Sequence, residues 1–357
     1  MRKPYSSITL AQATDLISAI GDTVTVLVQG EIGIGKSSIL KTLQKQHPDY
    51  VTCYVDITTK DVGDFLIPQV RQLDGTSVCS FIPNEEFGFH LKKPVIIMLD
   101  EIGKASKSVM NACLRLMLER KLGTHSLPEG SIVFATTNLA AEGIGDNLPP
   151  HARNRVDVVK VRKPTSDEWR LDYAMNAGID PVVIATAIEY PSMLASFEDY
   201  EMPSQNEYIY DPRVPRAAFV SPRSLEAASN VLKRCRHLPE DVVCHALMGV
   251  IGERATMDMM NILKLDVTMP TWKEVVTSPS TALVPSNGAT ACLMVSKALS
   301  NVSADNFDAW MVYMVRMAKE AQAMFAMSIM SGKSVKRDVA VRNRSFTDWC
   351  IANGYLF

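Results

Sequence analysis

Paired metal-binding or disulfide-forming residues are missing from this sequence. The seven cysteines occur without a C-x-x-C pair, and the six histidines occur without an H-x-x-x-H pair. Neither a zinc cluster nor a disulfide framework is therefore predicted, and no metal site built from cysteine or histidine is indicated. Reduced thiols in a cytoplasmic compartment fit this cysteine pattern best.

Long apolar runs and an excess of basic charge are also missing. No run approaches the roughly 18 uncharged apolar residues that a membrane-spanning helix needs, and no apolar signal core follows Met1-Arg2-Lys3-Pro4. The formal net charge of −2 provides no general attraction for nucleic acid or anionic membranes. We expect a cytoplasmic protein without a membrane partner. Nucleic acid is not favoured, although a basic run near the C-terminus leaves a local contact open as the alternative to a solvated face: Lys333, Lys336, Arg337, Arg342 and Arg344.

The first part of the chain alternates between strand-like and helix-like segments. Hydrophobic residues make up 47% of the 357 residues, which is enough to bury a substantial core. β-branched runs occur at residues 23–28, 50–55, 95–99, 131–135 and 156–161, with helical patterns between most of them. This alternation predicts an α/β fold in which a five-stranded parallel sheet is sandwiched by helices.

After Lys163-Pro164 the pattern becomes helical. We expect an α/β core over residues 1–163, an all-α region over 164–260 and a helical C-terminal extension over 261–357. Residues 190–222 lack a sustained period and predict an irregular insertion. Methionines from Met311 to Met330 recur at helical spacing and predict a helix face, used for core packing or, alternatively, as a pliable surface for a client.

A glycine-rich loop carries the strongest chemical signal. Residues 30–37 satisfy G-x-x-x-x-G-K-[ST], between a predicted strand and a predicted helix. Glycines let backbone N–H groups turn toward phosphates, and the helix N-terminus adds partial positive charge. Lys36 would reach the β- and γ-phosphates, and the Ser37 hydroxyl would bind Mg²⁺. The predicted ATP contacts are Gly30, Glu31, Ile32, Gly33, Ile34, Gly35, Lys36, Ser37 and Ser38; the alternative is a glycine turn that matches by chance.

Polar residues end two further predicted strands. Asp100 and Glu101 follow the apolar run 95–99, and this pattern predicts that Asp100 holds Mg²⁺ chiefly through water while Glu101 polarises the attacking water. Asn138 follows the run 132–135, whose end should lie beside that of the Asp100 strand. Asn138 could therefore orient the same water, or it could be an ordinary turn residue.

These motifs together resemble an AAA+ module, and more narrowly its MoxR and dynein-related branch. The likeness rests on the glycine loop as Walker A, Asp100-Glu101-Ile102 as Walker B, the predicted helix 106–120, the hairpin-like 122–130 and Thr136-Thr137-Asn138. Residues 61–65 and 81–83 fall where that branch carries an insertion. The resemblance covers roughly residues 8 to 235.

The resemblance implies a ring, usually hexameric, in which each ATP lies between neighbouring subunits. Asn138 matches the sensor-1 position. Arg155, with Arg153 second, falls within 148–155, where the family supplies an arginine finger; the alternative is a surface arginine pair. Arg223, in Ser221-Pro222-Arg223, resembles a sensor-2 residue; the alternative is a solvated arginine at a capped helix start.

Three functions remain in competition at this level. The resemblance implies an ATPase that remodels or activates a protein client, with a separate von Willebrand factor A (VWA) domain protein as one candidate partner. A nucleic-acid-directed motor or loader is the second hypothesis. An ATP-gated scaffold with little turnover is the third, and the presence of Glu101 and Asn138 disfavours it because a pure binder needs no water-positioning groups.

Overall fold

The computed structural model describes residues 7–139, 153–332 and 334–354. The chain divides into two compact units, Met1–Lys163 and Pro164–Phe357. Each unit has its own hydrophobic core.

The first unit is built on a parallel sheet with the strand order β2-β5-β8-β1-β9. The strands are β1 (Thr25–Gln29), β2 (Val51–Asp56), β5 (Val95–Asp100), β8 (Ile132–Thr137) and β9 (Val156–Lys160). The predicted α/β fold, with a five-stranded parallel sheet and a helical C-terminal region, is confirmed. All five strands lie within one or two residues of the apolar runs that predicted them.

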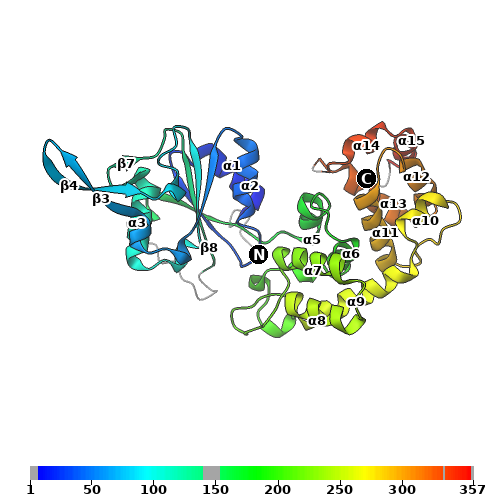
Figure 1. The fold of residues 1–357 in the computed structure, drawn as a ribbon. Helices are drawn as coiled ribbons and strands as arrows, with labels where there is room; N and C mark the ends of the chain where they lie inside the picture. The colour runs from blue at the N-terminus through cyan, green and yellow to red at the C-terminus, as the bar shows by residue number, and fades with distance from the viewer. Residues whose placement is uncertain (1–6, 140–152, 333, 355–357) are drawn as a thin grey trace. The chain divides into compact units, whose positions relative to one another are not determined.

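Helices cover both faces of this sheet, as Figure 1 shows. Alternate strand residues pack with α1 (Leu10–Ile20) and α2 (Ser38–Gln46) on one face, and with α3 (Lys107–Glu119) on the other. Burial of both faces explains why β5 is apolar along its whole length until Asp100.

Local capping signals set the ends of two of these helices. Thr9 and Gln12 form a reciprocal capping box at the start of α1. Ser106 caps α3 by accepting a hydrogen bond from the Val109 N–H. At the other end of α3, Arg120 donates to Thr25 Oγ1 and to the Gly21 carbonyl oxygen, which ties the helix to the amino end of β1.

Between β2 and α3 lies a hairpin that projects from the unit (Figure 1). It pairs β3 (Leu66–Leu73) with β4 (Thr76–Pro83) around an Asp74-Gly75 turn. The short turns η1 (Ile57–Thr59) and η2 (Val62–Asp64) precede it, and η3 (Glu85–Phe87) follows it; a fourth turn, η4 (Ile102–Lys104), comes after β5. A smaller hairpin, β6 (Lys121–Leu122) with β7 (His125–Ser126), follows α3. The larger hairpin occupies the segment where the family resemblance places an insertion.

Helices make up most of the regular structure in the described residues of the second unit, and isolated bridges pair Ile209 with Val220 and Asp211 with Val214. Its main helices are α5 (Ser166–Trp169), continued by a π-turn η6 (Arg170–Ala174), α6 (Pro181–Glu189), α7 (Pro222–Cys235), α8 (Glu240–Ile251), α9 (Glu253–Thr268), α10 (Trp272–Thr277), α11 (Gly288–Asn301), α12 (Phe307–Met314), α13 (Lys319–Met330), α14 (Arg337–Arg342) and α15 (Arg344–Ala352). The segment 190–222 contains the short turns η7 (Pro191–Leu194), η8 (Phe197–Asp199) and η9 (Pro203–Gln205).

Two features of this unit correct the sequence expectation. The division expected between residues 260 and 261 falls inside α9, and one core runs from Trp169 to Trp349. Continuous packing therefore makes 164–357 a single unit. The methionine-rich stretch is also not one helix, because α12 ends at Met314 and α13 begins at Lys319.

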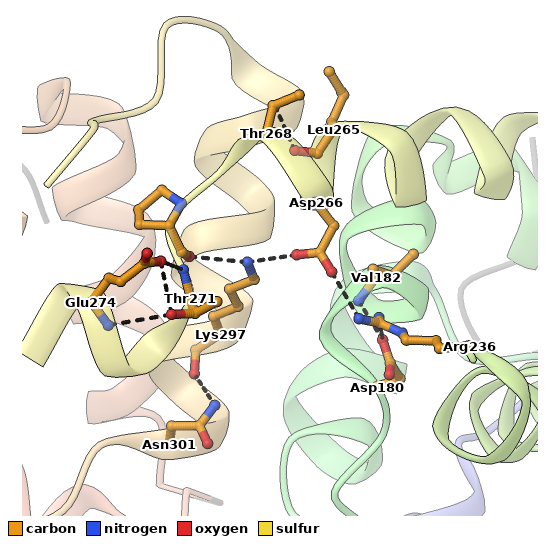
Figure 2. Close-up of polar contacts among 11 residues, drawn as sticks. Asp180, Val182, Arg236, Leu265, Asp266, Thr268, Thr271, Glu274, Lys297 and Asn301 are labelled. Atoms are coloured by element: carbon orange, nitrogen blue, oxygen red, sulfur yellow. Dashed lines mark hydrogen bonds and ion pairs between the residues drawn. The ribbon is translucent and has the colours of Figure 1, made fainter.

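A chain of alternating charges joins helices α9 and α11 to the start of α6 and the end of α7 (Figure 2). Arg236, at the end of α7, lies 2.9 Å from Asp180 Oδ1 and 2.8 Å from Asp266 Oδ2. Asp266 lies 2.5 Å from the Lys297 ammonium on α11. Burial raises the pKa of Asp180, and Arg236 and the Val182 N–H partly oppose that shift.

None of the helices in the described ranges combines the length and apolarity that crossing a bilayer requires.

Candidate functional site

The loop between β1 and α2 has a backbone that only glycine adopts easily. Gly33 and Gly35 have φ angles of 75° and 99°, in the region that side chains disfavour. At Gly30, an added Cβ would lie 2.5 Å from Ile34 Cδ1 and 3.1 Å from the Val161 carbonyl oxygen. Three glycines of the motif are thus required by the fold of the loop itself.

The Lys36 side chain turns back across this loop and is buried. Its ammonium donates to the carbonyl oxygens of Gly30, at 2.8 Å, and Glu31, at 3.0 Å. It also donates to Asn138 Oδ1 at 2.7 Å. These contacts hold the charge of Lys36 at the carboxyl edge of the sheet, between the ends of β1 and β8.

Two carboxylates stand at the same edge, where β5 ends. Asp100 is buried, and Glu101 has a φ of 57°, an uncommon conformation for a residue other than glycine. Thr136 of β8 holds both residues, because its hydroxyl donates to Asp100 Oδ1 and accepts from the Glu101 N–H. The Tyr54 hydroxyl donates to Asp100 Oδ2 at 2.8 Å.

The Glu101 carboxylate has partners on two sides. Asn138 Nδ2 lies 3.3 Å from Oε1 and 3.2 Å from Oε2. Lys104 Nζ lies 3.0 Å from Oε2, one turn further along η4. Asn138 therefore joins Lys36 to Glu101 through the two ends of its amide.

This donor set fits magnesium-bound ATP. The backbone at Gly33 and Gly35 turns as phosphate-binding loops require, and α2 begins directly after Ser37. The Ser37 side chain makes no capping bond to the helix backbone, whereas the Ser38 hydroxyl donates to the Gly35 carbonyl oxygen at 2.7 Å. Carboxylate and hydroxyl oxygens are the ligands that Mg²⁺ takes from proteins.

Two of the arginines singled out in the sequence, Arg153 and Arg155, lie at the opposite edge of the sheet from this cluster. Arg153 and Arg155 are exposed and directly precede β9, whose first residue, Val156, pairs with Thr25 at the amino end of β1. At about 3.3 Å per residue, roughly 15 Å separates that edge from the carboxyl edge where Lys36 lies. Residues 148–152 of the same motif lie outside the described residues.

Arg223 belongs to the second unit. It is exposed on the first turn of α7, whose capping residue Ser221 accepts from the Ser224 N–H.

Three residues of this site had no role assigned from the sequence: Tyr54, Lys104 and Thr136. Tyr54 breaks the apolar pattern of β2, but no motif distinguishes it from an ordinary surface tyrosine. Thr136 lies inside the quoted run Thr136-Thr137-Asn138, and Lys104 follows Asp100-Glu101-Ile102 by two residues. Strand order, rather than any local pattern, brings Tyr54 and Thr136 to Asp100.

Comparisons with known proteins identify no family. No protein-family model matches the sequence, and no curated protein matches it. Among solved structures, the chain is similar to NtrX from Brucella abortus, with a TM-score of 0.33 and 14% sequence identity over 99% of this chain and 68% of that one. A likeness this remote carries no weight for activity, so the function rests on the chain's own geometry.

Proposed function

We propose that this chain is a ring-forming ATPase of the AAA+ type, which binds ATP with Mg²⁺ and hydrolyses it. The observation that supports this most directly is the continuous link from Lys36 through Asn138 to Glu101. A phosphate-loop lysine, an amide and a carboxylate, drawn from three separate segments, meet at one edge of the sheet. Structural packing alone does not require this combination.

Each residue of the site has a defined part in this proposal. The backbone of residues 30–38 and the N-terminus of α2 hold the phosphates, and the Lys36 ammonium contacts the β- and γ-phosphates. Ser37 and Asp100 hold Mg²⁺, Asp100 chiefly through water. The bound metal would neutralise charge that develops on the phosphates during transfer.

Glu101 orients and polarises the attacking water. Its carboxylate is fixed by Asn138 Nδ2 and by Lys104, so little reorganisation is needed when the water is placed. Asn138 contacts Lys36 and Glu101 together, and it can therefore register the γ-phosphate on one side and the water on the other.

The proposal assigns Arg155, with Arg153 second, to the active site of a neighbouring copy. Both precede β9 at the edge of the sheet opposite Lys36, so they can reach a nucleotide only across a subunit interface. A closed ring, usually of six subunits, provides such an interface at every site. Arg223 would contact the γ-phosphate from the helical unit.

We further propose that the ring remodels or activates a protein client in a reducing cytoplasm. A separate VWA-domain protein is one candidate partner. All seven cysteines are free thiols, which is compatible with that compartment.

The first experiment measures ATP turnover per subunit against protein concentration, with native mass determined in parallel. Wild type is compared with Glu101→Gln and with the control Glu119→Gln, which changes an exposed carboxylate paired with Arg115. We expect turnover to rise steeply as a closed oligomer forms. Glu101→Gln should bind ATP, favour the oligomer and lose about 10²-fold or more in turnover.

Three results would count against parts of this proposal. Normal turnover by Glu101→Gln would show that Glu101 does not polarise the attacking water. Turnover that is independent of concentration in a persistent monomer would remove the ring. Stimulation by DNA or RNA that weakens steeply with salt would replace the protein client with nucleic acid.

A further inference from the structure

Both carboxylate oxygens of Asp100 accept hydrogen bonds from hydroxyl groups on neighbouring strands. Tyr54, on β2, donates to Oδ2 at 2.8 Å. Thr136, on β8, donates to Oδ1. Because β5 lies between β2 and β8, the carboxylate is held from both sides and cannot rotate without breaking one of these bonds.

The register of the sheet explains why Tyr54 reaches Asp100. Tyr54 pairs with Met98, so Asp100 lies two residues further along β5 on the same face. The long tyrosine side chain spans this diagonal, as the 2.8 Å distance from its hydroxyl to Asp100 Oδ2 shows. Asp56 is directly opposite Asp100, but its Oδ1 already accepts from the Thr58 N–H at 3.0 Å and the Thr58 hydroxyl at 2.7 Å.

We propose that Tyr54 is a positioning residue for the carboxylate on the magnesium side of the site. The inference rests on the proposed function and adds a residue that no motif indicates. Each carboxylate oxygen can accept more than one hydrogen bond, and the hydroxyl groups of Tyr54 and Thr136 occupy one position on each. The remaining positions are then fixed in direction, ready for the water shell of nucleotide-bound Mg²⁺.

Loss of the Tyr54 hydroxyl should therefore weaken the binding of Mg²⁺ and not the binding of the nucleotide itself. Outer-shell partners that orient a metal-binding carboxylate typically contribute about 10- to 100-fold to metal affinity. The Tyr54 hydroxyl contacts Asp100 and is not part of the phosphate loop, so its loss should leave nucleotide affinity without metal unchanged. Because the Tyr54 side chain is 52% exposed, Tyr54→Phe removes the hydroxyl without opening a buried cavity.

The test measures equilibrium binding of a fluorescent non-hydrolysable ATP analogue, first in EDTA and then during titration with Mg²⁺. Wild type is compared with Tyr54→Phe and with Tyr50→Phe. Tyr50 directly precedes β2, so this control removes the same hydroxyl at the opposite end of the same strand. For Tyr54→Phe we expect unchanged affinity in EDTA and about a 10-fold increase in the Mg²⁺ concentration that gives half of the metal-dependent gain. Tyr50→Phe should behave as wild type.

Other outcomes would overturn the inference, in distinguishable ways. A Mg²⁺ requirement that is the same in Tyr54→Phe and wild type would show that Tyr54 does not position Asp100. An equal loss of affinity with and without Mg²⁺ would place its effect on the nucleotide or the fold instead. If the wild-type protein bound the analogue equally well with and without Mg²⁺, Asp100 would have no role in metal binding. If the wild-type protein did not bind the analogue at all, the proposed function would also be wrong.

Discussion

The Asn138 amide joins Lys36 to Glu101 in one orientation only. Its Oδ1 accepts from the Lys36 ammonium at 2.7 Å, and its Nδ2 donates to the Glu101 carboxylate at 3.2 Å. Rotation of the amide by half a turn would set an NH₂ group against an ammonium and an oxygen against a carboxylate. The two charged partners therefore fix the amide, and the amide holds the two charges in a defined relation.

Replacement of this amide should affect turnover more than binding. In Asn138→Ala, Lys36 keeps its two carbonyl acceptors, whereas Glu101 loses the donor that orients its carboxylate. We expect kcat to fall about 10²-fold and ATP affinity to fall less than about 10-fold. Steady-state turnover and equilibrium binding of the same preparations measure the two effects.

The matched control for this substitution is Asn84→Ala. Asn84 lies in the same unit and accepts from the Glu86 N–H, outside the Lys36 cluster. It should retain wild-type turnover. If Asn138→Ala lost affinity and turnover in equal measure, Asn138 would act in binding alone.

A mixing experiment tests whether Arg155 acts on a neighbouring subunit. Glu101→Gln and Arg155→Ala should each be inactive alone, with a loss of about 10³-fold or more for the arginine. In rings assembled from equal amounts of both, roughly one interface in four pairs an intact Glu101 with an intact Arg155. ATP turnover should therefore reappear when the two variants are mixed. A parallel series with Arg153→Ala in place of Arg155→Ala tests the second candidate arginine.

Because Arg155 lies at the amino end of β9, a failure of the mixed variants to recover turnover would also be informative. Mixtures that remain inactive, from variants that are each inactive alone, would mean that Arg155 serves its own subunit, whereas normal turnover of Arg155→Ala alone would mean that it serves none. Recovery with Arg153→Ala, together with normal turnover of Arg155→Ala, would exchange the two assignments.

Gly30 should be intolerant of even one added carbon. In Gly30→Ala the new Cβ would meet Ile34 Cδ1 at 2.5 Å and the Val161 carbonyl oxygen at 3.1 Å, so the buried Ile34 side chain or the loop that carries it must shift. We expect an ATP affinity about 10-fold lower and a unit destabilised by about 1–3 kcal/mol. Gly63→Ala is the control, because an added Cβ there meets nothing within 4 Å. Equal affinities for the two variants and wild type would contradict the close packing of the loop.

The buried Asp180 carboxyl predicts a pH dependence for the second unit. Burial raises its pKa in the folded state, so the folded form takes up a proton as pH falls through that raised value. The stability from this proton uptake is fully present below the unfolded pKa and is lost as pH rises through the folded pKa. Relative to wild type, Asp180→Asn should therefore be more destabilised near pH 4 than near pH 7.

Tryptophan fluorescence during urea unfolding measures this effect in the right unit. All four tryptophans, Trp169, Trp272, Trp310 and Trp349, lie in Pro164–Phe357. A difference in unfolding free energy that stays constant across this pH range would show that Arg236 and the Val182 N–H offset the burial of Asp180 completely.

Much of the first unit could be predicted because its signals are local. Apolar runs of five or six residues located the strands, and the predicted helix 106–120 agrees with α3, which Ser106 caps through a residue three positions away. The glycine pattern of residues 30–37 likewise depends on short-range backbone geometry. The second unit was harder, because helical periodicity does not show where one helix ends and the next begins, as between α12 and α13.

The sequence by itself therefore determined the α/β fold class, the position of the glycine-rich loop between β1 and α2, and the presence of polar residues at two strand ends. Only the tertiary structure decided which side chains meet: the order β2-β5-β8-β1-β9 places Tyr54 and Thr136 on either side of Asp100, and the direction of β9 places Arg155 at the far edge from Lys36. The physical reason is that propensity and periodicity act over a few residues, whereas contacts between Tyr54 and Asp100, or Lys36 and Asn138, depend on strand pairing across tens to a hundred positions in the chain.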